Sequence, residues 1–315
     1  MREKSLIDRI RRSSRRGPGI AIGIGDDCAV LRVPPRHELL VTTDFTLENV
    51  HFRRNWHPPE VVGWRCLTRG LSDIAAMGGE PRAAFLSLAL DRNVAQKWVN
   101  RFMSGLLEAA KEFRVILAGG DTAESDGGIQ ADIVLVGSVP RGTAIPRSGA
   151  RPGDAIYVTG ELGGSAAALE ELRKGKVRAS DFARHFHPTA RVQVGQWLRG
   201  RGFASAMIDT SDGFSTDIAH ICEESGVGAV VEAAAIPRAR VGRPLRPVSL
   251  DLALHGGEDY ELLFTSAVRI PAKVAGVPVT RVGRITSKRG MMLVGEDQRL
   301  RKLAAHGWQH FQPRS

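Results

Sequence analysis

The segment PRGTAIPRSGARPGD, residues 140–154, decides how this chain is divided. It is rich in proline, glycine and arginine, and it separates two stretches in which apolar runs alternate with turn residues. Proline and glycine interrupt regular secondary structure, so a cluster of them between two such stretches is typical of a domain boundary. A chain of 315 residues is long enough for two domains. We therefore expect domains over residues 1–147 and 148–315.

Both halves show patterns of strands and helices outward from this boundary. Before it, the short apolar runs IAIGIG, HELLVTT, AAFLSLAL, VILAGG and ADIVLVGSV predict strands. Apolar residues at helical spacing predict helices over residues 59–77 and 94–113. After the boundary, AIYVTG predicts a strand that leads through a glycine-rich turn to a helix. The predicted fold class is α/β, or α+β, with two domains.

The composition is typical of a globular protein without a membrane span. Hydrophobic residues make up 43% of the chain, and no apolar run approaches the roughly 20 residues that a spanning helix needs. The first residues lack the apolar core of a secretory signal. Cys28, Cys66 and Cys222 have neither pairing nor metal-ligand spacing. We therefore expect a cytoplasmic protein that does not bind a membrane.

The net charge of +10 is compatible with nucleic acid, an acidic membrane face or small anionic substrates as partners. Aromatic residues make up only 6% of the chain, and neither zinc-ligand spacing nor an RNA-binding signature is present. We expect no nucleic-acid binding, and a basic nucleic-acid-binding protein is the non-enzyme alternative.

Aspartate recurs at the ends of predicted strands and once in a helical pattern. Six segments carry these residues: Asp26 and Asp27 in GIGDD, Asp44 in VTTD, Asp73 in LSDIAAMGG, Asp121 in LAGGD, and Asp209 and Asp212 in MIDTSD. Any one of them is an ordinary turn former or helix cap. Mg²⁺ gives a physical reason for gathering several, because it prefers carboxylate oxygens and bridges them to substrate phosphates. Residues 207–214 contain no Lys or Arg that would compete with such a cation.

The motifs of the common nucleotide-binding and hydrolytic enzymes are absent. The chain has no G-x-x-x-x-G-K-[ST] loop, protein-kinase signature set, G-x-S-x-G elbow or H-E-x-x-H zinc motif. The pattern therefore favours binding of a polyphosphate through metal ions that carboxylates hold.

As a set, the motifs resemble the thiamine-monophosphate kinase family, in the superfamily of aminoimidazole ribonucleotide synthetase and selenophosphate synthetase. The matching segments run in order from about residue 22 to residue 311: GIGDDCAVL, VTTDFTLENVHF, LSDIAAMGG, GGDT, PRSGARPGDAIYVTGELGGSAAAL, HPTARV, IDTSDGF, GGEDYELLF and GWQHF. The segments NVHF, GGEDYEL and GWQHF are more specific to this family than to its relatives.

The resemblance implies the two-domain fold of aminoimidazole ribonucleotide synthetase. In it an N-terminal sheet domain binds ATP and Mg²⁺ and forms the core of a homodimer, and the C-terminal domain is α/β. The implied reaction is ATP-dependent phosphorylation of thiamine monophosphate to thiamine diphosphate with several Mg²⁺ ions. We expect direct in-line transfer, because phosphoryl transfer depends on positioning and charge neutralisation.

The family's motifs also imply the site residues. The metal ligands would be Asp27, Thr42, Thr43, Asp44, Asp73, Asp121, Asp209 and Asp212. ATP would contact Gly120, Asp121, Arg147 and Ser211. Thiamine phosphate would contact His51, Glu258 and Trp308. Catalytic roles would fall to Asp209, Asp212 and Arg147.

Alternatives stay open at this point. The enzyme alternative is another ATP-using member of the superfamily, similar to aminoimidazole ribonucleotide synthetase. His51, Glu258 and Trp308 each have an ordinary structural interpretation, as a half-buried histidine, a residue after a glycine turn and a cover for an apolar patch. The chain departs from the family at Gly70, Ala123 and Glu124. The Glu124 charge would repel a polyphosphate unless a metal ion or an arginine lies beside it.

Overall fold

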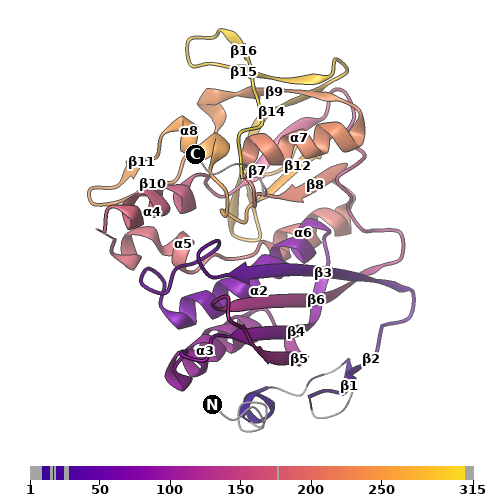
Figure 1. The fold of residues 1–315 in the computed structure, drawn as a ribbon. Coiled ribbons are helices and arrows are strands. Elements are labelled where there is room, and N and C mark those ends of the chain that lie inside the picture. The colour runs from indigo at the N-terminus through magenta and orange to yellow at the C-terminus, as the bar shows by residue number, and fades with distance from the viewer. Residues whose placement is uncertain (1–8, 15–16, 18, 25–27, 176, 309–315) are drawn as a thin grey trace. The chain divides into compact units, whose positions relative to one another are not determined.

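The computed structural model describes residues 9–14, 17, 19–24, 28–175 and 177–308. The chain forms two compact units, shown in Figure 1. Unit 1 comprises residues 1–74 and 79–142, and unit 2 comprises residues 75–78 and 143–315. The chain passes from one unit to the other within the proline- and glycine-rich segment 140–154.

Unit 1 is built on a four-stranded mixed sheet with the order β3-β6-β4-β5. The strands are β3 (His37–Leu47), β4 (Glu80–Leu90), β5 (Ile116–Glu124) and β6 (Gln130–Pro140). β6 is antiparallel to β3 and β4, and β4 is parallel to β5. The short apolar runs of the sequence predicted all four strands. β3 forms one edge of the sheet.

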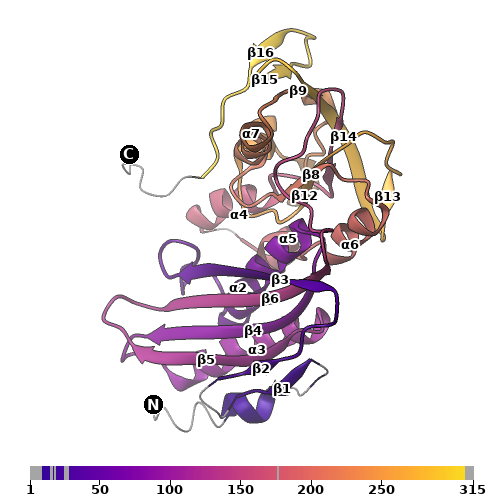
Figure 2. The ribbon, with the colours of Figure 1, turned by 90° about the vertical axis from the view of Figure 1, so that its right-hand side faces the viewer.

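Two helices cover one face of this sheet, as Figure 2 shows. They are α2 (Pro59–Ala76) and α3 (Gln96–Glu112), close to the predicted bounds. Gly70 of α2 lies against Leu135 of β6, and an added Cβ there would already be in tight contact. This contact gives a packing reason for glycine at position 70.

The opposite face of the sheet is only partly covered. The hairpin of β1 (Ile20–Ile22) and β2 (Val30–Leu31) packs on a cluster of small and branched residues that includes Val136. Along β3, however, the same face carries three exposed apolar side chains. Leu39, Val41 and Phe45 are 50%, 63% and 57% exposed.

Unit 2 is built on an eight-stranded sheet with the order β16-β15-β9-β14-β7-β12-β8, in which β13 pairs only with β14. Its strands are β7 (Ala155–Thr159), β8 (Ala206–Asp209), β9 (Gly228–Glu232), β12 (Leu262–Ser266), β13 (Lys273–Val274), β14 (Val277–Thr286), β15 (Gly290–Val294) and β16 (Leu300–Lys302). The pair β9–β15 is parallel, and the other strand pairs in the described part of this sheet are antiparallel.

Short helices connect these strands. They are α4 (Gly164–Arg173), α5 (Ala183–Phe186), α6 (Val192–Arg201), α7 (Phe214–Ser225) and α8 (Leu250–His255), with 3₁₀ turns η1 (Ala179–Phe182) and η2 (Ala233–Ala235) and a hairpin of β10 (Arg240–Val241) and β11 (Arg246–Pro247). All four residues of β8 are buried, so this strand fixes the loop that follows it. No helix in the described part of the chain has the length and hydropathy needed to cross a membrane.

Candidate functional site

A cavity in unit 1 lies beside the GGDT segment of β5, which is predicted to bind ATP. Its volume is about 540 Å³, and its lining includes Gly119, Gly120, Asp121 and Thr122. Gly120 has φ of 150°, and an added Cβ would overlap the carbonyl oxygen of Leu86 on the neighbouring strand β4, so this position of β5 requires glycine. The exposed Asp121 accepts a hydrogen bond from the Thr122 amide at 2.8 Å. A cavity of this volume is large enough for a nucleotide-sized ligand.

Three of the predicted metal ligands come together between β3 and α2. Thr42 Oγ1 donates a hydrogen bond to Asp73 Oδ2 at 2.5 Å. Arg69 Nε donates to Asp44 Oδ1 at 3.0 Å, and this ion pair is mostly buried. Arg69 and Asp73 lie one turn apart on α2, so the helix presents a base and an acid to the same strand. The name β3–α2 group is used below for Thr42, Asp44, Asp73 and Arg69.

The other predicted residues of unit 1 lie elsewhere. Thr43 is exposed, and strand alternation directs its side chain away from Thr42 and Asp44, so only its backbone could join the β3–α2 group. His51 follows β3, and its Nδ1 accepts a hydrogen bond from the Leu47 amide at 3.0 Å. In the neutral ring the proton therefore lies on Nε2. Asp27 lies outside the described residues.

The Glu124 carboxylate has an arginine partner. Arg92 Nε donates a short hydrogen bond to Glu124 Oε1, and both side chains are more than half exposed. The negative charge of Glu124, three residues after Asp121, is therefore balanced within the same unit.

In unit 2, the predicted residues Asp209, Ser211 and Asp212 lie in the loop between β8 and α7. Asp209 occupies the last position of β8 and is 3% exposed. Ser211 and Asp212 follow it and are half-buried. The loop ends at Gly213, directly before α7.

The GGEDYEL segment is joined to this loop by backbone hydrogen bonds. The Thr210 amide donates to the Glu261 carbonyl at 2.8 Å, and the Tyr260 amide donates to the Thr210 carbonyl at 3.0 Å. The Glu258 amide then donates to the Ser211 carbonyl at 2.8 Å. These bonds continue the β8–β12 ladder beyond the sheet and bring Glu258 beside Ser211.

The carboxyl-terminal segment reaches the same loop. The Trp308 amide donates to the Asp212 carbonyl at 2.9 Å, and the Trp308 side chain is 53% exposed. Three motifs far apart in the sequence thus meet in unit 2: IDTSDGF, GGEDYEL and the start of GWQHF. They bring together Ser211, Asp212, Glu258 and Trp308.

Arg147 lies away from this group. Its carbonyl accepts a hydrogen bond from Ser225 Oγ at 3.4 Å, at the C-terminal end of α7. Asp212 precedes the N-terminal end of the same helix, whose 12 residues span about 18 Å. Within unit 2, the structure does not bring the predicted catalytic residue Arg147 to Asp209 and Asp212.

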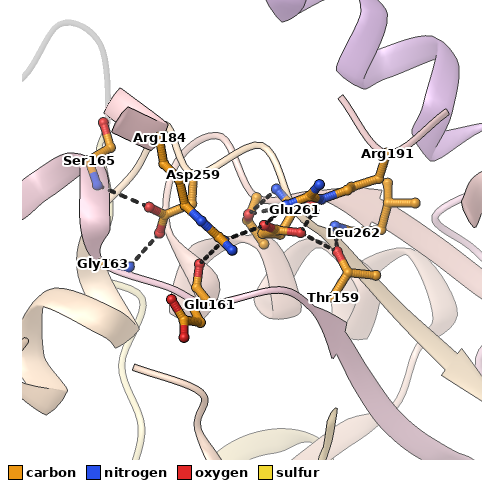
Figure 3. Close-up of polar contacts among 10 residues, drawn as sticks. Thr159, Glu161, Gly163, Ser165, Arg184, Arg191, Asp259, Glu261 and Leu262 are labelled. Atoms are coloured by element: carbon orange, nitrogen blue, oxygen red, sulfur yellow. Dashed lines mark hydrogen bonds and ion pairs between the residues drawn. The ribbon is translucent and has the colours of Figure 1, made fainter. Parts of the chain in front are cut away.

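The Asp259 carboxylate holds the glycine-rich turn before α4, as Figure 3 shows. It accepts hydrogen bonds from the backbone amides of Gly163 at 2.6 Å and Ser165 at 3.2 Å. Withdrawal of the carboxyl group from solvent raises the Asp259 pKa to about 7, although these two hydrogen bonds act in the opposite direction. The amides that could have held a phosphate at this helix start are therefore bound to an internal carboxylate.

Glu261 is the centre of a second network in Figure 3. The carboxylate is buried and accepts hydrogen bonds from Thr159 Oγ1 at 2.6 Å, Arg184 at 2.9 Å and Arg191 Nε at 2.6 Å. Two arginines and a hydroxyl thus stabilise the one carboxylate that immediately precedes β12. This network fixes the C-terminal end of the GGEDYEL segment.

Comparisons with known proteins agree with the motifs. Residues 25–139 match the family described as AIR synthase related protein, N-terminal domain, and residues 151–310 match its C-terminal domain. A thiamine-monophosphate kinase of Haemophilus influenzae is 38% identical over 284 residues, which cover 86% of this chain and 85% of that protein. The chain belongs to the thiamine-monophosphate kinase family.

Solved structures of the thiamine-monophosphate kinase family share the fold. The enzyme from Stenotrophomonas maltophilia K279a is 35% identical, with a TM-score of 0.82 over 93% of this chain and 96% of that chain. A structure described as AaThiL complexed with AMPPCP and TMP is 33% identical, with a TM-score of 0.78 over 99% of both chains. The predicted α/β architecture with two domains of the aminoimidazole ribonucleotide synthetase type is confirmed.

One acidic residue beside the family's IDTSDGF motif was not among the predicted site residues. Asp217, in the first turn of α7, is 1% exposed, and its Oδ2 accepts a hydrogen bond from the Gly213 amide at 3.1 Å. Within the described part of the chain, its buried Oδ1 has no hydrogen-bond partner. Burial, and then the charges of Asp209 and Asp212, raise the Asp217 pKa well above its usual value.

These residues fit a divalent cation by their chemistry. No three His, Cys, Asp or Glu side chains within the described ranges lie close enough together to hold a metal ion. The negative charges of Asp209 and Asp212 nevertheless act on the buried Asp217 carboxyl group, and such a group is stabilised by either a proton or a cation. Hard oxygen donors of this kind suit Mg²⁺.

Proposed function

We propose that this chain transfers the γ-phosphoryl group of ATP to thiamine monophosphate and releases thiamine diphosphate and ADP. The observation that carries the proposal is the meeting of Ser211, Asp212, Glu258 and Trp308 in one loop cluster of unit 2. Membership of the thiamine-monophosphate kinase family supports it, as does a relative solved with AMPPCP, an ATP analogue, and TMP.

The reaction requires no covalent intermediate on the protein. A phosphate oxygen of thiamine monophosphate forms a bond to the γ-phosphorus, and the bond from that phosphorus to the β,γ-bridging oxygen breaks. ADP leaves with the electron pair of the broken bond. An ionised phosphate is already a nucleophile, so the chain's residues need to align the two phosphates and neutralise their charge.

The ATP site is assigned to the cavity of unit 1 beside Gly120 and Asp121. The glycine allows the backbone to approach a ligand closely, and the cavity has a suitable volume. Ser211 and Arg147, which belong to unit 2, stay predicted contacts of the polyphosphate, and a guanidinium suits bidentate binding of phosphate. Arg92 offsets the charge of Glu124 near this site.

Mg²⁺ is assigned to the carboxylates of both units. The proposed ligands are Thr42, Asp44, Asp73, Asp121, Asp209 and Asp212, with the backbone of Thr43 and the predicted ligand Asp27. Bound Mg²⁺ would offset the negative charge of the phosphates that these acidic residues otherwise repel. The orphaned oxygen of Asp217 supports a cation near Asp209 and Asp212.

Thiamine phosphate is assigned to His51, Glu258 and Trp308. The half-exposed indole of Trp308 offers a face for stacking on the cationic thiazolium ring. The Glu258 carboxylate suits a positively charged or hydrogen-bond-donating part of the same substrate. The half-buried His51 carries its neutral-form proton on Nε2, which suits donation to a phosphate oxygen.

We also propose that the enzyme is a cytoplasmic homodimer that pairs through unit 1. The open apolar face of the edge strand β3 supports dimerisation, because Leu39, Val41 and Phe45 form an exposed row next to unpaired backbone groups. Val41→Asp should give a monomer in light scattering after gel filtration. Leu245→Asp, at an exposed loop residue of unit 2, is the matched control. A monomeric wild-type protein would refute this pairing.

The three free cysteines support a reducing compartment.

The kinase activity is tested by ³¹P NMR of the purified protein with ATP, Mg²⁺ and thiamine monophosphate. The expected result is the pair of doublets of thiamine diphosphate together with ADP, both lost when EDTA is added. A folded protein that leaves ATP intact would refute the proposal and favour a different acceptor within the superfamily. Salt-sensitive submicromolar binding to nucleic acid would favour the non-enzyme alternative.

A further inference from the structure

Three successive backbone amides of the carboxyl-terminal segment bind to the start of α7. The His306 amide donates to Ser215 Oγ at 3.3 Å, and the Gly307 amide donates to Thr216 Oγ1 at 2.9 Å. The third bond joins the Trp308 amide to the Asp212 carbonyl. Figure 2 shows the chain after β16 running beside α7. We call these three bonds the clasp.

The two hydroxyls of the clasp are buried and positioned by the helix. Ser215 is 0% exposed and Thr216 is 4% exposed, in the first turn of α7. A hydroxyl at a helix start commonly caps its own helix, whereas these two accept hydrogen bonds from a segment about 90 residues away. They provide acceptors for amides that would otherwise have to be satisfied by water.

Gly307 is required by the closeness of the clasp. A Cβ at this position would overlap both the Asp212 carbonyl oxygen and Thr216 Oγ1. The glycine therefore lets the segment lie directly on the loop that carries Asp212, one residue before the indole of Trp308 enters the site.

A histidine at the end of α8 contacts the Ser215 hydroxyl of the clasp. His255 Nδ1 lies 2.8 Å from Ser215 Oγ, and the rings of His255 and His306 meet edge to face with centroids 5.4 Å apart. Three segments of unit 2 are thus joined at Ser215: α7, the end of α8 and the carboxyl-terminal segment. This leaves Ser215 little freedom to rotate away from the His306 amide.

We propose that Ser215 and Thr216 are positioning residues for the acceptor substrate. By binding the backbone of residues 306–308, they hold the Trp308 side chain where it contacts thiamine phosphate and tie it to the Asp212 loop. The inference rests on the proposed function, in which Trp308 contacts this substrate. Neither hydroxyl needs to touch thiamine phosphate or ATP for this role.

The first test compares the steady-state kinetics of Thr216→Val with those of the wild-type protein. Valine keeps the branched shape and removes the acceptor, so the KM for thiamine monophosphate should rise about tenfold, as expected for one lost hydrogen bond. The kcat and the KM for ATP should stay within about twofold of wild type, because the Thr216 hydroxyl touches neither ATP nor the reacting phosphates in this role. Thr216→Ser should restore the KM.

Hydrogen exchange measured by mass spectrometry gives a readout that does not depend on turnover. Amides 306–308 should exchange faster in Thr216→Val and at the wild-type rate in Thr216→Ser. Thr286→Val is the matched control. Its Oγ1 also bonds a backbone group, the Lys288 carbonyl at 3.0 Å, but Thr286 pairs with Gly228, beyond the other end of α7.

Gly307→Ala tests the clasp from the other side, and it keeps the inference testable should Thr216→Val fail to fold. It should raise the KM for thiamine monophosphate by more than Thr216→Val does, because a Cβ displaces the whole segment. Wild-type KM values and exchange rates in both variants would overturn the inference while leaving the kinase intact. A wild-type protein that does not phosphorylate thiamine monophosphate would instead refute the proposed function, and with it the role of Trp308.

Discussion

The acidic residues of unit 1 and those of unit 2 are stabilised in different ways. In the β3–α2 group, Arg69 pairs with Asp44 and Thr42 donates to Asp73, so the protein itself supplies a positive charge. Beside Asp209 and Asp212, the buried Asp217 has a raised pKa and one oxygen without a hydrogen-bond partner in the described ranges. The raised pKa means that Asp217 binds a proton more readily than an ordinary carboxyl group, in a place where no positive side chain is among the causes of the shift.

The difference determines which positive species a bound metal ion would have to replace in each group. A metal ion entering the β3–α2 group competes with an arginine side chain, whereas one entering the α7 loop displaces a proton. The second group should therefore bind metal more weakly as the pH falls, and the first should respond mainly to removal of Arg69. Four predictions break or sharpen this contrast, from the largest expected effect to the smallest.

Asp212→Asn is expected to have the largest effect. The kcat should fall about 100-fold or more, because a carboxylate proposed to hold the Mg²⁺ that would neutralise the charge of the transition state is lost. In EDTA the melting temperature should hold or rise, because Asp217 loses a neighbouring negative charge. Turnover at saturating substrates and thermal unfolding followed by circular dichroism measure the two effects. Asp297→Asn, in the turn between β15 and β16, should change neither. Parallel loss of stability and activity would indicate a purely structural role.

Asp217→Asn should raise the melting temperature of the metal-free protein, by at least about 2 °C. The folded-state pKa of Asp217 exceeds that of the unfolded chain, so the folded protein holds a proton that the unfolded chain releases. The free energy of unfolding therefore falls as the pH rises from the usual carboxyl range toward neutrality.

Asp217→Asn should reduce the decrease in the free energy of unfolding between pH 5 and pH 8. Urea unfolding in EDTA measures this dependence on pH. The Asp259 carboxyl, with its pKa of about 7, contributes a fall of the same sign that the substitution leaves in place. An unchanged slope in Asp217→Asn would show that Asp217 is ionised in the folded protein.

Arg69→Met should have a smaller effect on stability than Asp217→Asn, and it should destabilise the protein. Loss of the partly buried ion pair should lower the free energy of unfolding by about 1 kcal/mol and increase the stabilisation that added Mg²⁺ provides. Thermal unfolding across a MgCl₂ titration measures both changes. Arg101→Met, which removes an exposed ion pair with Glu60 in the same unit, should leave the Mg²⁺ response unchanged. An unaltered response in Arg69→Met would exclude Asp44 as a metal ligand.

The smallest effect is expected at the exposed pair of Arg92 and Glu124. Arg92→Gln leaves the Glu124 charge unbalanced and should raise the KM for ATP about threefold at low salt, with less effect at high salt. Glu124→Gln should leave the KM within about twofold of wild type. Steady-state kinetics at two ionic strengths distinguish the variants. A strong loss of ATP binding in Glu124→Gln would instead make Glu124 a metal ligand.

Much of the fold was predictable from local patterns. Helical spacing of apolar residues located α2 and α3 within about two residues of their bounds, and short apolar runs located β3, β4, β5 and β6. The strand order β3-β6-β4-β5 was not predictable in this way, because pairing depends on contacts between segments far apart in the chain.

The candidate site was predictable where a motif ends a strand and less so inside helices. Asp217 lies in an apolar helical pattern, where an acidic residue in the first turn is unremarkable, so only its burial and its neighbours distinguish it. Arg69 lies four residues before Asp73, a spacing that indicates a shared helix face but not an ion pair with β3. The functional roles of all the predicted site residues, Asp27, Arg147 and His51 among them, stay predictions.

The backbone hydrogen bonds between the loop after β8 and the GGEDYEL segment have an evolutionary consequence. Thr210, Ser211, Tyr260 and Glu258 are joined mainly through main-chain atoms, which substitutions at most of these positions leave in place. Side chains such as that of Glu258 are therefore free to diverge while the scaffold keeps its geometry. With this arrangement, a new acceptor would require exchange of side chains on a common backbone frame and no refolding of the loops that carry them.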